Sequence, residues 1–241
     1  MVFVEIWEVK MKNDPLETPK ATIHDAAHTI VKAGLGLIPV VGSASAELFT
    51  ALITPPLEKR RDEWMTQVGE RLQELAEQGR INLDDLQNDD GFIDLLMNAS
   101  QAAIRNSQEE KKEALLNAVT NAALKLSPEE ALQQVFVRWI DDFTVWHLRL
   151  LSLFQNPTEW GKRHKKQFAS HGTHSLSLIL EEAYPELKEE RKLYEIVWRD
   201  LYQQGLFNTD KLNTIMTGGG LSQRRTTDAG NEFLLFIEKV D

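Results

Sequence analysis

Helix-start signals recur along the chain and constrain its fold more than any other feature of the sequence. A residue that favours a helix N-cap is followed directly by proline at Thr18-Pro19, Ser127-Pro128 and Asn156-Pro157. Proline suits the first helical position because its φ is already helical and its missing N–H would have no partner there. Glu130 follows Ser127 at the spacing of a capping box. These signals predict helices over about 18–32, from 128 to about 154, and from 157 onward.

Between these signals, apolar residues recur every three or four positions, as they do on one face of an amphipathic helix. The clearest case predicts a helix over about 57–78, ended by Gly79, with an apolar stripe made of Leu57, Trp64, Met65, Val68, Leu72, Leu75 and Ala76. Further helices are predicted over about 108–125, 173–183 and 186–204, the last ended by Gly205. The predicted fold is therefore mainly α, a multi-helical bundle.

The C-terminal residues follow a different pattern. They predict a short helix over 209–216, a glycine turn, a strand near 221–226 and a final helix from Asp228. This succession suggests a small winged-helix-like unit. Three regions are therefore predicted: an N-terminal segment over 1–56 with an apolar helical hairpin, a central helical bundle over 57–172, and the winged-helix-like unit over 173–241.

The segment from Gly34 to Pro56 carries a single formal charge, at Glu47. A membrane-spanning helix needs about 20 consecutive apolar residues, whereas Gly34, Gly36 and Pro39 interrupt this segment. We therefore expect two short helices, the second over about 43–53 and ended by Thr54-Pro55-Pro56, packed as a hairpin. The hairpin either belongs to the core or contacts a membrane or a partner, and the candidate contact residues are Leu37, Ile38, Val40, Val41, Leu48 and Phe49.

Composition narrows the class of protein. The chain is 42% apolar and 27% charged, which is typical of a globular protein with a core. Its formal net charge of −10 disfavours a nucleic-acid binder. It has no cysteine and no signal-peptide pattern at its start, which fits a cytoplasmic protein that can associate peripherally with a membrane. Another protein is the expected partner and a membrane is the alternative; the sequence does not indicate whether the chain self-associates.

Two basic clusters stand out in this acidic chain. Lys162, Arg163, Lys165 and Lys166 form the densest one and are candidate anion contacts, although a solvated helix face is the favoured explanation for them. Arg224 and Arg225 lie near the presumed wing, where DNA-binding proteins contact phosphate. They make a winged-helix transcription regulator the alternative function.

Catalytic and metal signatures are weak. His24 and His28 share a helix face, as two zinc ligands would, but Asp25 stands where a metalloprotease helix has glutamate and no third ligand is indicated. His164, His171 and His174 lie close in sequence, but their spacing matches no strong metal-site signature. His147 with Asp141 or Asp142 is a candidate acid–base pair for a hydrolase, although no nucleophile is indicated beside it. The glycine-rich "MTGGGLSQ" matches neither a phosphate-binding nor a dinucleotide-binding loop. We therefore expect no metal, no cofactor and no enzymatic activity.

Three stretches carry a resemblance to a known group of proteins. They are "DDGFIDLLMNASQAAIRNSQEEKKEALLNAVTNAAL", "FVRWIDDFTVWHLRLLSLFQNP" and "TTDAGNEFLLFI". Their succession resembles bacterial helical proteins of the abortive-infection alpha type. The resemblance implies an all-helical fold and a bacterial setting, often one of phage defence, and it transfers no functional residue. The leading hypothesis is a non-enzymatic interaction or effector protein in phage defence or stress.

Overall fold

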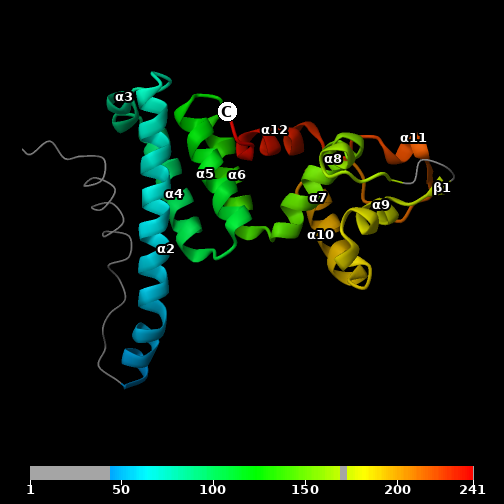
Figure 1. The fold of residues 1–241 in the computed structure, drawn as a ribbon, viewed down its shortest axis with the longest axis horizontal. Helices are drawn as coiled ribbons and strands as arrows, with labels where there is room; N and C mark the ends of the chain where they lie inside the picture. The colour runs from blue at the N-terminus through cyan, green and yellow to red at the C-terminus, as the bar shows by residue number, and fades with distance from the viewer. Residues whose placement is uncertain (1–43, 169–172, 241) are drawn as a thin grey trace, which may run out of the picture. The chain divides into compact units, whose positions relative to one another are not determined.

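The computed structural model describes residues 44–168 and 173–240, which fall in one compact unit over 42–241. The described residues are mainly helical, so the predicted fold class is confirmed at that level (Figure 1). Within them, the only sheet is an antiparallel pair of two-residue strands, β1 (Thr173–His174) and β2 (Met216–Thr217). The helix predicted over 18–32 and the first half of the predicted hairpin lie outside the described residues.

The first described helix, α2 (Ala44–Glu77), runs without interruption through Pro55 and Pro56. The predicted helix end at 54–56, and with it a separate short helix over 43–53, is therefore wrong. The two prolines lack the N–H groups that would bond the carbonyls of Ala51 and Leu52. Because both of these residues are exposed, water can bond their carbonyls instead. The helical φ of proline then lets the helix continue.

A first group of helices surrounds α4 (Asp90–Arg105), which packs against α2, α5 (Glu109–Ala123) and α6 (Glu130–Asp142), with the short α3 (Leu83–Gln87) beside it. The apolar stripe predicted on α2 faces this group, since Trp64, Val68, Leu72 and Leu75 are all buried. The indole Nε1 of Trp64 donates to Oγ of Ser100 at 2.9 Å, which satisfies the one polar atom of that buried ring.

The single helix predicted over 128–154 is two helices. α6 begins at Glu130 with Glu129 at its N-cap, so the capping box expected at Ser127 is wrong. The chain leaves the helix at Phe143, which is extended and buried, and α7 (Val145–Gln155) begins after Thr144. The ring of Phe143 meets Phe233 of α12 (Asp228–Ile237) edge to face, 6.2 Å between centroids. This contact joins residues that are distant in sequence, and a capping box between Thr144 and His147 starts the second helix.

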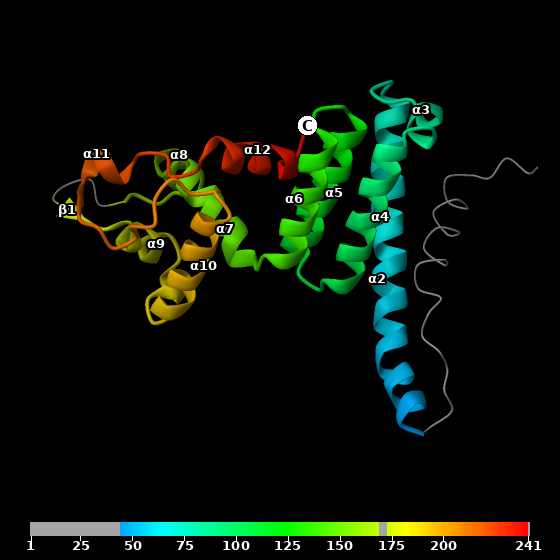
Figure 2. The same cartoon turned by 180° about the vertical axis from the view of Figure 1, so that it is seen from behind.

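A second group of elements surrounds α7, which packs against α8 (Pro157–Arg163), α9 (Leu176–Ala183) and α10 (Arg191–Gln203). The N-cap predicted at Asn156 is confirmed, because its side chain accepts a hydrogen bond from the Glu159 N–H at 3.1 Å. A 3₁₀ turn (Pro185–Leu187) precedes α10. Helix α12 contacts both α5 and α7 and so links the two groups (Figure 2).

The C-terminal elements differ from those predicted. Residues 209–215 form irregular backbone with one turn at 212–213 instead of a helix, and the short α11 (Gly218–Leu221) follows β2. In place of a strand over 221–226, only Thr226 makes a single β-bridge, to Phe207. β2 instead pairs with β1, which lies some forty residues earlier in the chain. The final helix does begin at Asp228, as predicted, and Thr227 is its N-cap.

Candidate functional site

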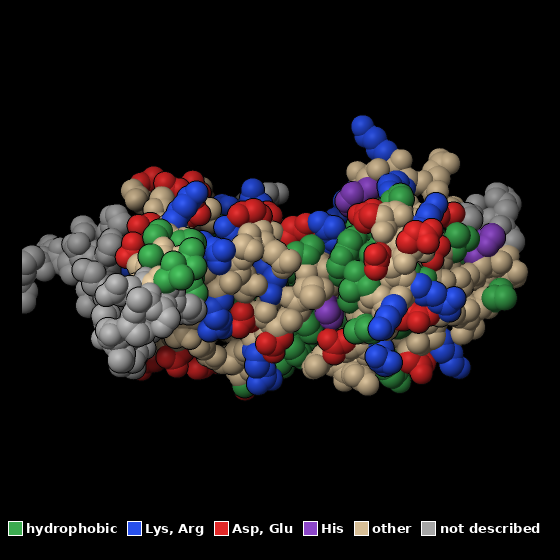
Figure 3. Space-filling model, turned by 90° about the horizontal axis from the view of Figure 1, so that it is seen from below, with side chains coloured by type: hydrophobic (Ala, Val, Ile, Leu, Met, Phe, Trp, Pro, Cys, Tyr) green, Lys and Arg blue, Asp and Glu red, His purple; other side chains and the backbone are tan. Residues whose placement is uncertain are grey.

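The start of α2 exposes apolar side chains. Leu48 and Leu52 are 62% and 66% exposed, and they lie one turn apart on the helix. Figure 3 shows hydrophobic atoms over this part of α2. Among the other candidate contacts of this segment, Leu37, Ile38, Val40 and Val41 and the side chain of Phe49 lie outside the described residues. None of the helices in the described ranges is both long and apolar enough to cross a membrane.

The charges that follow on α2 balance one another locally. Lys59 pairs with Glu63 at 3.6 Å, and Arg61 pairs with its neighbour Asp62 at 3.2 Å. The third cation of this cluster, Arg60, points its Nη1 at the carbonyls of Ile104 and Arg105, 3.5 Å from each. The apolar start of α2 is thus not followed by a surface of net positive charge.

The basic run at 162–166 forms the C-terminal cap of α8. The N–H of Lys166 donates to the carbonyl of Gly161 at 2.8 Å and that of Lys165 to the carbonyl of Lys162 at 3.2 Å, the two bonds of a Schellman motif. Lys165 stands at φ 54°, where glycine is usual. A Cβ on Gly161 would lie only 2.8 Å from the Lys166 carbonyl oxygen. The basic residues therefore lie where a helix end favours positive charge.

Two of the four candidate anion contacts have partners within the protein, and two do not. Lys162 pairs with Glu159 at 2.6 Å, and the Lys166 ammonium donates to the carbonyls of Glu182 and Ala183 at 3.1 and 2.6 Å. Lys165 and Arg163 are exposed, and neither side chain has a hydrogen bond or an ion pair with any residue that the structure describes. Of these two free cations, only Arg163 faces a pocket.

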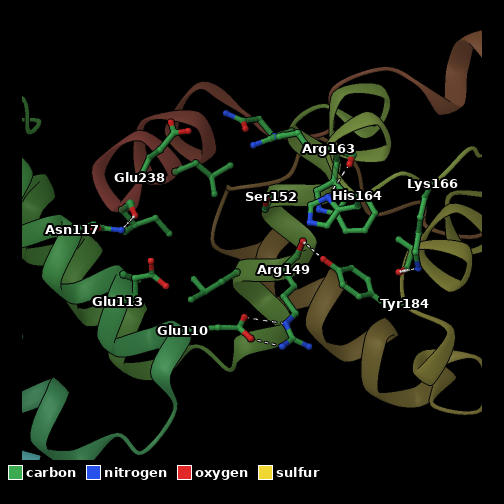
Figure 4. A pocket seen from close by; sticks show the side chains of 17 residues that line it. Glu110, Glu113, Asn117, Arg149, Ser152, Arg163, His164, Lys166, Tyr184 and Glu238 are labelled. Atoms are coloured by element: carbon green, nitrogen blue, oxygen red, sulfur yellow. Dashed lines mark hydrogen bonds and ion pairs between the residues drawn. The ribbon is translucent and has the colours of Figure 1, made fainter. Parts of the chain in front are cut away.

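That pocket has a volume of about 580 Å³ and lies where α5, α7, α8, the end of α9 and the end of α12 meet (Figure 4). Its apolar lining includes the buried Leu148, Trp160 and Leu234. Glu113 on α5 and Glu238 after α12 lie on one side, and Arg163 and His164 at the end of α8 lie on the other. Its size is in the range of small-molecule sites, which is about 300–1,000 Å³.

A charge pair lies in one wall of the pocket. Arg149 on α7 binds both carboxylate oxygens of Glu110 on α5, with its Nε 3.0 Å from Oε2, and this hydrogen bonding raises the pKa of Arg149. The Arg149 guanidinium also lies over the ring of Trp146, 4.9 Å from the centroid. Beside it, burial raises the pKa of Tyr184 to about 12, so its hydroxyl stays protonated at neutral pH. The Tyr184 hydroxyl donates to the Arg149 carbonyl oxygen at 3.4 Å, so the tyrosine and the arginine of this wall both already have partners within the protein.

His164 is held in one orientation. Its ring stacks on Trp160, with 3.8 Å between centroids and 15° between planes. Its Nδ1 lies 2.8 Å from the Trp160 carbonyl oxygen, which can only accept, so Nδ1 carries the proton. Nε2 has no partner among the described residues, and in the neutral ring it is a hydrogen-bond acceptor.

His147 lies away from this pocket, and its partner is neither of the two candidates, Asp141 and Asp142. It is buried, its Nε2 lies 3.1 Å from Oδ2 of Asp200, and it does not line the pocket described above. Asp141 instead contacts Arg105 and accepts from Nδ2 of Asn106 at 3.0 Å. Asp142 is exposed. The geometry thus gives the hydrolase hypothesis no substrate-accessible acid–base pair.

The two candidate DNA contacts differ in accessibility. Arg224 is exposed and pairs with Asp228 at 3.2 Å. Arg225 is half-buried, where its Nη2 contacts the Gly220 carbonyl oxygen and lies 3.2 Å from Sδ of Met216, and burial lowers its pKa. Arg225 therefore supports the short α11 that follows β2, and of the two arginines only Arg224 is exposed.

The histidine sets lie largely outside the described ranges. His24, His28 and His171 fall in the undescribed residues. Over 44–168 and 173–240, no three His, Asp or Glu side chains gather in a way that could hold a metal ion.

A search of protein-family models, of curated proteins and of solved structures found no match to this chain. The interpretation of each site therefore depends on its geometry. Sequence reasoning had singled out Arg163 and Lys166 but missed the other charged residues of the pocket, which extend from Glu110 to Glu238. No local pattern marks them, because five separate elements bring them together.

Proposed function

We propose that the protein is a non-enzymatic helical interaction or effector protein of bacterial phage defence or stress, and that residues 34–56 bind its partner. The observation that supports this is the pair Leu48 and Leu52, both about two-thirds exposed on consecutive turns of α2. Exposed apolar side chains at i,i+4 spacing are what a helix presents to an apolar groove on another protein. The sequence resemblance described above supports the defence setting.

A protein is favoured over a membrane as the partner. Interfacial helices that bind anionic lipids combine an apolar face with an excess of lysine and arginine. Here the basic residues after the apolar segment are matched by Asp62 and Glu63 or point at backbone carbonyls. The chain as a whole carries a net charge of −10, which further disfavours an anionic surface. We place the protein in the cytoplasm, with membrane association as the alternative to be tested.

The double variant Leu48→Glu/Leu52→Glu tests the binding segment in the full chain. Both side chains are exposed, so charge at these positions should leave the thermal unfolding midpoint unchanged while it abolishes partner binding. The matched control is Leu126→Glu, because Leu126 is 60% exposed and lies at the end of α5. Affinity capture from bacteria under phage challenge should recover a protein with the wild type and the control but not with the double variant. Recovery that is equal for all three would overturn the proposal.

Two further readouts separate the alternatives. Co-sedimentation with vesicles of phosphatidylethanolamine and phosphatidylglycerol, lost only in the double variant, would identify a membrane instead of a protein as the partner. Plaque counts on cells expressing the chain should fall with the wild type and recover with the double variant. Plaque counts that the wild type does not change, across a panel of phages, would contradict the defence role.

A second candidate function, supported by the exposed Arg224, is a winged-helix-like DNA-binding regulator over 173–241. Phosphate contacts by an exposed arginine would make its binding salt-dependent. Arg224→Ala is the informative variant, because Arg225 is held within the structure. A gel shift on genomic fragments at low salt should weaken in Arg224→Ala and persist in Arg138→Ala, a change at an exposed arginine outside this unit. A shift that is absent, or equal in both variants, would exclude this function.

A further inference from the structure

The charges that line the 580 Å³ pocket sum to zero. Three positive side chains, Arg149, Arg163 and Lys166, face three negative ones, Glu110, Glu113 and Glu238. A ligand of net charge would upset this balance in a partly desolvated site, and the unmatched charge would oppose binding. A ligand that carries one charge of each sign would not.

The contacts within the protein show which of these charges are available. Arg149 and Glu110 neutralise each other, and the Lys166 ammonium is bound to two carbonyls. Arg163, Glu113 and Glu238 have exposed side chains without a hydrogen bond or an ion pair to any described residue. One free cation therefore lies on the α8 side of the pocket, and two free carboxylates lie on the side of α5 and α12 (Figure 4).

The rest of the lining suits a small organic molecule. Leu148, Trp160 and Leu234 supply buried apolar surface between the two charged sides. His164 is fixed by its stack on Trp160, and its free Nε2 is beside Arg163, where it can hydrogen-bond a ligand. Pockets of this kind combine an apolar body with a few placed polar groups that orient the ligand.

We propose that this pocket binds a small zwitterion, an amino acid or short peptide, whose ammonium group faces Glu113 and Glu238 and whose carboxylate faces Arg163. An apolar side chain of the ligand lies against Leu148 and Trp160. The site is independent of the start of α2, so this proposal goes beyond the partner-binding function proposed above. The two proposals can be tested separately.

Isothermal titration of the full chain tests the proposal with matched probes. The probes are L-phenylalanine, the dipeptide Ala-Phe, N-acetyl-Ala-Phe, which lacks the ammonium, and Ala-Phe-amide, which lacks the carboxylate. At least one of the two zwitterions should bind, and Ala-Phe should bind about tenfold more tightly than either blocked form, as expected for one charge-assisted hydrogen bond. Failure of both zwitterions to bind, or blocked dipeptides that bind as well as Ala-Phe, would overturn the proposal.

Two charge-neutralising variants assign the two ends of the ligand. Arg163→Gln should remove the preference for Ala-Phe over its amide, and Glu113→Gln combined with Glu238→Gln should remove the preference over the acetylated form. Arg138→Gln and Glu232→Gln are the controls, because both residues are exposed and lie outside the pocket. Preferences that survive in the pocket variants, with unfolding midpoints unchanged, would place the binding elsewhere and contradict the assignment.

Discussion

The Nε2 atom of His147 lies 3.1 Å from Oδ2 of Asp200, a contact that ties α7 to α10. The Nδ1 of the same ring accepts a hydrogen bond from the Thr144 backbone N–H at 3.1 Å, so the neutral ring carries its proton on Nε2 and donates it to the carboxylate. Burial lowers the pKa of His147, and the opposing effect of Asp200 is smaller. The folded protein therefore holds a neutral histidine between two helices.

This histidine should make the protein less stable in mild acid. Because its pKa is lower in the folded state than in the unfolded chain, the unfolded chain binds the proton first as the pH falls. The free energy of unfolding should therefore decrease as the pH drops below about 6.5, the ordinary pKa of histidine. Denaturant titrations between pH 8 and 5 measure this slope. His147→Gln should make the slope shallower, and His164→Gln is the control for an exposed ring; equal slopes in the wild type and His147→Gln would contradict the prediction.

Gly230 should be intolerant of any side chain. A Cβ at this position would lie 2.4 Å from the Leu206 carbonyl oxygen and 3.2 Å from Cβ of Thr226, where α12 begins against the chain that follows α10. We expect Gly230→Ala to destabilise the protein by about 1–3 kcal/mol, as overpacking does. Gly69→Ala, within α2 with no atom near the added Cβ, should instead stabilise it by about 1 kcal/mol. Chemical denaturation measures both, and a Gly230→Ala protein as stable as the wild type would show that α12 can move away from Leu206.

Replacing Lys165 with glycine should stabilise the protein. It occupies the left-handed region at φ 54°, which costs a residue with a side chain about 1–2 kcal/mol. Lys165→Gly should therefore raise the free energy of unfolding by about 0.5–1 kcal/mol after the higher backbone entropy of glycine is included. Lys165→Ala is the control, because it removes the same charge but keeps the unfavourable φ. A similar gain in both variants would attribute the effect to the lost charge.

Asn121 should be essential for the end of α12. Its side chain is buried, and its Nδ2 donates to the carbonyls of Phe236 and Glu238 at 2.8 and 3.0 Å. Asn121→Ala would leave these helix-end carbonyls without a donor and open a small cavity, so we expect a loss of about 2–3 kcal/mol. Asn98→Ala, which removes an exposed hydrogen bond to Gln134, should cost no more than about 0.5 kcal/mol. Thermal unfolding compares the two, and equal losses would argue against a special role for Asn121.

The helix ends illustrate where sequence reasoning works. Gly79 and Gly205 were expected to end their helices, and both stand at positive φ, at 70° and 75°. Lys125 and Lys165 occupy the same conformation at the ends of α5 and α8, at 58° and 54°, but lysine carries no signal for it. The same contrast holds for the prolines, since Pro157 opens a helix as expected whereas Pro55 lies inside one. A rule such as glycine at a helix end or proline at a helix start holds where the backbone preference of that residue is strong and nothing opposes it.

The sequence by itself determined the helical class, the apolar face of α2, the cap at Asn156 and the start of α12 at Asp228, because these depend on contacts within one or two helical turns. Only the tertiary structure decided the contact of Phe143 with Phe233, the pairing of His147 with Asp200, and the meeting of Glu113, Arg163 and Glu238 around one pocket. The residues in each of these contacts lie tens of positions apart or more. Such contacts form because they bury apolar surface and compensate charge between distant elements. The periodicity of the sequence therefore does not reveal them.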